Sequence, residues 1–62
     1  MINDYDMVKA AKDLNEKVLS GCIGAVVMVH KGPAPGYEVE FFSSSDETIA
    51  ILTVKPDEIV KG

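Results

Sequence analysis

The sequence predicts a small all-β domain built from about five short antiparallel strands. Two observations carry this prediction: turn-forming residues recur at short intervals, and the segments between them are rich in β-branched and aromatic side chains. The connections of about four to six residues that separate these segments suit antiparallel hairpins. A chain of 62 residues has room for one small core, so we expect a single domain over residues 1–62.

Three strands are predicted in the middle of the chain, where the clusters GPAPG and SSSD separate them. They are residues 23–30, 37–42 and 48–54. The middle strand gives the clearest signal, because apolar residues alternate with Glu38 and Glu40, as expected when one face of a strand is buried. After the third strand, Pro56 begins at most one helical turn, and residues 58–61 return to the sheet.

The N-terminal part of the chain allows two interpretations. Residues 6–19 carry apolar side chains at helical spacing, and Gly21 could end such a helix as the residue after its last turn. Alternatively, residues 6–10 form a short strand and a turn follows, with Leu14 tucked under the sheet. Helix propensity alone favours the first interpretation.

Five segments, taken in order, resemble the small bacterial family described as domain of unknown function 4926. They are residues 6–8 (DMV), 21–27 (GCIGAVV), 37–41 (YEVEF), 47–53 (ETIAILT) and 55–59 (KPDEI). The resemblance implies a small SH3-like β-barrel in which residues 6–10 are the first strand and residues 13–19 an irregular crossing loop. Where the family pattern has glycine, this chain has Asp46, which tolerates the left-handed conformation better than most residues. The family brings no catalytic residues to carry over.

The charge of the chain argues against nucleic-acid binding. Its formal net charge is −4, and its six basic residues are all lysines, whereas arginine is the usual residue for forked contacts to phosphates and bases. The longest uncharged apolar run, residues 21–29, is too short to span a bilayer, and the acidic N-terminus lacks the layout of a signal peptide. We therefore expect a cytoplasmic protein that binds neither nucleic acid nor membrane.

Residues that could carry chemistry are few. Cys22 cannot form a disulfide within the chain, and on a straight strand it lies too far from His30 for the two to share a metal ion. We therefore expect no metal and no cofactor. Glu38 and Glu40 share one face of a strand and could do acid–base work with His30, but a solvated outward face is the simpler interpretation. Glu40 could instead pair with Lys9 or with His30.

The alternating middle strand predicts which side chains form the core. We expect the core to contain Val39, Phe41, Val27, Val29, Leu14 and part of residues 49–54. Both parities of residues 26–29 and 49–52 are apolar, however, and Phe42 breaks the alternation before the next turn. One apolar set must then face outward, unless the loop at residues 11–20 covers it through Val18 and Leu19.

An uncovered apolar face on a small protein marks a binding site. The candidate partner-contact residues are Val26, Met28, Phe42, Ala50 and Leu52. We expect either a symmetric homodimer or a dedicated protein partner at this face, with Met28 as its adaptable element.

Three functions follow from these observations, in order of preference. The first is a small non-catalytic protein-binding module, either an adaptor or an antitoxin or immunity-type protein, whose acidic charge suits a basic partner. The second is an accessory subunit or regulator of an enzyme, with Glu38, Glu40 and His30 as acid–base residues. The third is a nucleic-acid-binding barrel.

Overall fold

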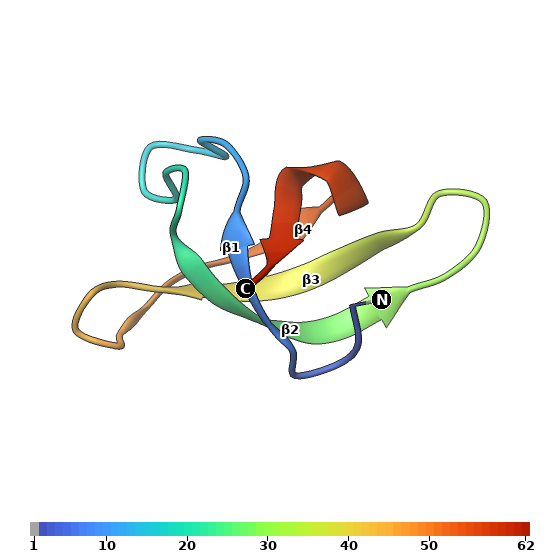
Figure 1. Cartoon of the computed structure of the whole chain (residues 1–62), viewed down its shortest axis with the longest axis horizontal. Helices are drawn as coiled ribbons and strands as arrows, with labels where there is room; N and C mark the ends of the chain where they lie inside the picture. The colour runs from blue at the N-terminus through green and yellow to red at the C-terminus, as the bar shows by residue number, and fades with distance from the viewer. Residues whose placement is uncertain (1) are drawn as a thin grey trace.

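The computed structural model describes residues 2–62, in which five strands form one antiparallel sheet with the order β4–β3–β2–β1–β5 (Figure 1). The strands are β1 (Met7–Ala10), β2 (Ile23–His30), β3 (Gly36–Phe42), β4 (Thr48–Val54) and β5 (Ile59–Lys61). A single 3-10 turn, η1 (Pro56–Glu58), precedes β5. The predicted all-β fold is confirmed, and each predicted strand begins and ends within one residue of its expected bounds.

Strand β1 answers the question that the N-terminal pattern left open. It lies between β2 and β5, and Lys9 pairs with Ile23 on one side and with Val60 on the other. The helix favoured by propensity is wrong, because as a strand this segment buries Val8 and Ala10 in the core, and tertiary packing overrides a weak helix propensity. The strand implied by the family resemblance is confirmed.

The loop between β1 and β2 is held by its own side chains. The Asn15 side-chain oxygen accepts hydrogen bonds from the backbone N–H groups of Lys17, at 2.8 Å, and Val18, at 2.7 Å. Asp13 accepts another from the N–H of Ser20 at 2.7 Å. These bonds turn the chain so that Val18 enters the core, where it is fully buried.

The core lies on the concave face of the curved sheet, closed on one side by the β1–β2 loop (Figure 1). Its buried members are Val8, Ala10, Val18, Val26, Val39, Phe41, Val54 and Ile59. The predicted core positions of Val39 and Phe41 are confirmed, and Leu14 and Val29 are half-buried against the cluster. Val27, also predicted in the core, is instead 38% exposed.

A β-bulge in β2 explains the error at Val27. Val26 pairs with Val39 and Met28 pairs with Glu38, so Val27 is an extra residue without a partner on β3. The inward parity therefore changes within the strand, and Val26 is fully buried while both Val27 and Met28 are exposed. The prediction that Val26 faces a partner is wrong for the same reason, because it assumed a straight strand.

Strand β4 corrects two more candidate residues. Ala50 pairs with Phe41 and Leu52 pairs with Val39, and paired residues project from the same face of a sheet. Ala50 and Leu52 therefore face the core, where they are half-buried, and their predicted outward orientation is wrong. Ile51 lies between them and points outward.

Two tight places depend on particular residues. Gly24 lies so close to β3 that an added Cβ would approach Val39 Cγ1 to 2.6 Å and Phe41 Cδ1 to 2.9 Å. Asp46 has a φ of 64°, so the expected left-handed turn residue is confirmed. The backbone N–H of Ser43 donates to the Glu47 carbonyl at 2.8 Å and closes this turn between β3 and β4.

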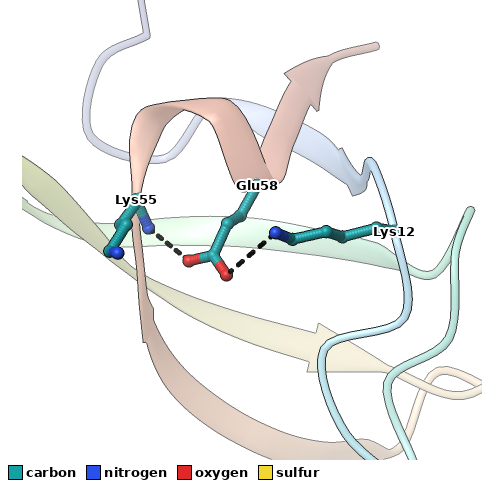
Figure 2. Close-up of polar contacts among 3 residues, drawn as sticks. All are labelled: Lys12, Lys55 and Glu58. Carbon is teal, nitrogen blue, oxygen red and sulfur yellow. Dashed lines mark hydrogen bonds and ion pairs between the residues drawn. The ribbon is translucent and has the colours of Figure 1, made fainter.

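The 3-10 turn is joined to the β1–β2 loop by one carboxylate (Figure 2). The Glu58 Oε1 atom accepts a hydrogen bond from the Lys55 backbone N–H at 2.7 Å, which caps the start of η1. Its Oε2 atom lies 3.9 Å from the Nζ atom of Lys12, which belongs to the β1–β2 loop. Pro56 provides the fixed φ angle that suits the first position of this turn.

Candidate protein-contact surface

The convex face of the sheet carries large apolar side chains on four of its strands. Met7 pairs with Ala25, Ala25 with Glu40, and Glu40 with Ile51, so these residues form one row across β1, β2, β3 and β4. Lys9 lies between Ile23 and Val60 in a second row. We define the outer surface by the side chains on this face that are 47–61% exposed, namely Met7, Ile23, Met28, Ile51 and Val60.

The β1–β2 loop does not cover the outer surface. Val18, one of the two residues expected to shield it, is fully buried in the core instead. Leu19, the other, is itself 53% exposed. The loop therefore adds apolar area to the exterior of the molecule, and the side chains that define the outer surface remain 47–61% exposed.

Phe42 lines a hollow beside this surface. It is half-buried at the end of β3, and Leu19, Cys22, Ile23 and Ile49 line the same hollow. The Cys22 thiol points toward the Phe42 carbonyl, with a sulfur-to-oxygen distance of 3.5 Å. Because Ile23 belongs both to the hollow and to the outer surface, the two apolar areas are continuous.

Two carboxylates lie among the apolar residues of the convex face. Glu38 Oε2 lies 3.3 Å from His30 Nε2, and Glu40 accepts a hydrogen bond of 2.5 Å from the Thr48 hydroxyl. The expected pairing of Glu40 with Lys9 or His30 is wrong, because the register places Thr48 near Glu40 and His30 near Glu38. The face thus combines apolar contacts with negative charge.

No cluster of three metal-ligating side chains occurs within the described residues 2–62. The three residues considered for acid–base work are only partly brought together, because His30 meets Glu38 while the carboxylate of Glu40 is held by Thr48. The same part of the chain contains no helix that is long and apolar enough to cross a membrane.

The carboxyl group of Asp6 lies just before β1 and is held by two contacts. The pKa of Asp6 is lowered, chiefly because its carboxylate accepts a hydrogen bond from the Asn3 backbone N–H at 2.9 Å. The Lys61 ammonium group, 3.3 Å from the carboxylate, lowers the pKa further. This group connects the residues before β1 to β5 and has a structural role.

Sequence comparison links the chain to a known family. The family model described as "Domain of unknown function (DUF4926)" matches residues 4–61, a range that contains all five strands. The chain belongs to this family. No curated protein and no solved structure matches it.

For this DUF4926 protein, the sequence identified one exposed member of the outer surface and missed the others. Met28 is 50% exposed, as predicted, and Phe42 borders the surface. Ile23, Ile51 and Val60 were missed because strand pairing decides which parity faces outward, and a bulge reverses that parity within β2. For Met7 a signal was available, since Met7 and Lys9 alternate with buried residues once β1 is accepted as a strand.

Proposed function

We propose that this protein is a small non-catalytic protein-binding module and that the outer surface is its contact face. The observation that carries the proposal is the set of apolar side chains on four strands of the convex face that remain 47–61% exposed. Large exposed apolar patches on small proteins mark interaction sites. Methionine side chains at two of these positions, Met7 and Met28, supply adaptable contacts.

The charge of the molecule supports a basic partner. The net charge is −4, and Glu38 and Glu40 project from the same convex face as Met28 and Ile51. Complementary charge speeds association and excludes wrong partners more than it adds affinity. We place the protein in the cytoplasm, where its free thiol at Cys22 stays reduced, as an adaptor or as an antitoxin or immunity-type protein that neutralises a basic toxin.

The experiment is a pull-down from native lysate with matched variants of the outer surface. Met28→Lys and Met7→Lys each place a positive charge among the apolar contacts, and we expect both to lose a basic partner that the parent protein captures. Ala34→Lys adds the same charge to the exposed loop between β2 and β3 and should keep that partner. Equal capture by all of these variants would show that the contact lies elsewhere.

A second candidate role rests on the 3.3 Å contact between His30 and Glu38. An imidazole beside a carboxylate is a common arrangement for acid–base work, so the protein could regulate or assist an enzyme at this position. Substituting alanine for His30, Glu38 or Glu40 separates the two roles. Loss of an activity with partner binding intact favours the enzyme-associated role, and loss of binding alone favours the contact surface.

A further inference from the structure

The two edges of the sheet are built differently. The edge strand β5 has three residues, ends in a charged lysine, Lys61, and follows directly on η1. Short edge strands, charged side chains and nearby prolines are the usual means by which proteins prevent further strands from adding. Strand β5 has all three, since Pro56 opens the turn before it.

Strand β4, at the opposite edge, lacks these protections along most of its length. It has seven residues, reads TIAILTV and contains neither a charge nor a proline. Its register with β3 is regular from Ala50 to Val54, and the irregularity near Ile49 affects only its first residues. Within residues 2–62, β4 pairs with β3 alone, so backbone groups along its other side are available for pairing.

We propose that β4 pairs with β4 of a second copy of this chain, in antiparallel orientation, and so joins two sheets into one. Ile51 lies at the middle of the strand and is 61% exposed. A two-fold axis at this residue places the two Ile51 side chains together and sets Leu52 of one copy opposite Ala50 of the other. Along the regular part of the strand, every opposed pair is then uncharged.

The charges that flank β4 fit this orientation. Asp46 and Glu47 precede the strand, Lys55 follows it, and all three are exposed. Antiparallel self-pairing brings the acidic start of one strand beside the basic end of the other, at both ends of the interface. Parallel pairing would instead bring like charges together. The alternative partner for this edge is a basic extended segment of a different protein, and its charges would complement only the acidic start of β4.

Sedimentation equilibrium from about 10 μM to about 1 mM tests the proposal. We expect the parent protein to dimerise in this range. Ile51→Lys places two ammonium groups at the axis and should raise the dimer dissociation constant about tenfold or more. Val60→Lys is the matched control, because Val60 is a similarly exposed aliphatic residue, at 51%, on the protected edge strand. It should dimerise like the parent.

Disulfide trapping tests the register independently. In a Cys22→Ser background, Ile51→Cys should cross-link to itself on mild oxidation, because residues opposed across antiparallel strands have Cα atoms about 4.5–5.5 Å apart. Val60→Cys should remain uncross-linked. Circular dichroism of each variant tests whether the sheet is intact. If Ile51→Lys fails to fold, Thr53→Lys replaces it.

Three results would overturn the proposal: a parent protein that is monomeric throughout the range, a dimer that Ile51→Lys leaves unchanged, or equal weakening by Val60→Lys. This dimer shares Ile51 with the outer surface, but it is formed by the open backbone edge of β4, from which Met28 on β2 is separated by β3. Met28→Lys should abolish partner capture and leave the dimer intact, so the two ideas can fail separately.

Discussion

At the scale of single residues, Phe41 is the largest fully buried side chain in the protein. Phe41→Ala should lower the free energy of unfolding by about 3–5 kcal/mol, because it removes the buried ring and leaves a cavity. At about 0.05–0.15 kcal/mol per residue, a domain of 62 residues has a total stability of roughly 3–9 kcal/mol, so the variant should be close to unfolding or unfolded. Thermal or urea denaturation followed by circular dichroism measures the change.

The neighbouring phenylalanine provides the control. Phe42 is half-buried on the convex side, so Phe42→Ala should cost clearly less than Phe41→Ala. Equal costs for the two variants would contradict the inward assignment of Phe41 and the outward assignment of Phe42.

Asp6 predicts part of the acid sensitivity of the fold. Its pKa is lowered in the folded protein by the Asn3 backbone hydrogen bond and by Lys61. A carboxyl whose pKa is lower when folded than when unfolded contributes stability above its unfolded pKa, and that contribution is lost as the pH falls through the folded value. The loss therefore occurs below about pH 4.

In Asp6→Asn the stability should consequently fall less steeply on acidification than in the parent protein. Urea unfolding at neutral pH and at successively lower pH measures the difference. Asp4→Asn is the control, because Asp4 is an exposed carboxyl on the same segment. If Asp4→Asn flattens the acid limb as much as Asp6→Asn does, the contacts of Asp6 are not its cause.

At the scale of the element, β2 predicts opposite outcomes for adjacent valines. Val26→Asp places a carboxylate in the core and should unfold the protein. Val27→Asp, one residue further along the chain, should fold with a cooperative transition close to that of the parent, because the bulge leaves this side chain exposed at 38%. Denaturation curves of the two variants, measured side by side, distinguish this arrangement from a regular strand, in which Val27 would be the sensitive position.

The same strand shows how far the sequence could predict the structure. Strand bounds followed well from turn residues and β-branched composition, because those are local preferences of the chain. The orientation of β3 followed from the strict alternation of its apolar residues with Glu38 and Glu40. In β2 both parities are apolar, and nothing local marks Val27 as the residue without a partner. The pairing of β2 with β3 decides which residue of β2 has no partner. Because this pairing depends on two segments together, the local sequence of β2 alone does not predict it.

At the scale of the whole molecule, three features of the proposed contact site lie on the convex face of the sheet. The outer surface, the hollow around Phe42 and the carboxylates of Glu38 and Glu40 lie together because strand pairing directs their side chains to the convex face of one sheet. A domain of this length buries only about 60% of the surface that its unfolded chain exposes. Apolar residues beyond that capacity must lie outside, where they are available to other proteins.

The pairing of β5 with β1 also has a consequence for the order of events during folding. Lys9 and Val60 are partners although most of the chain separates them. Contacts between such distant segments form late, because the entropy of closing the loop is lost before any contact compensates for it. Until β5 docks against β1, Ile59 is absent from the core and β1 has an open edge. The β2–β3–β4 meander pairs strands that are neighbours along the chain, so it can form before this step, and the sheet is complete only once β5 has docked.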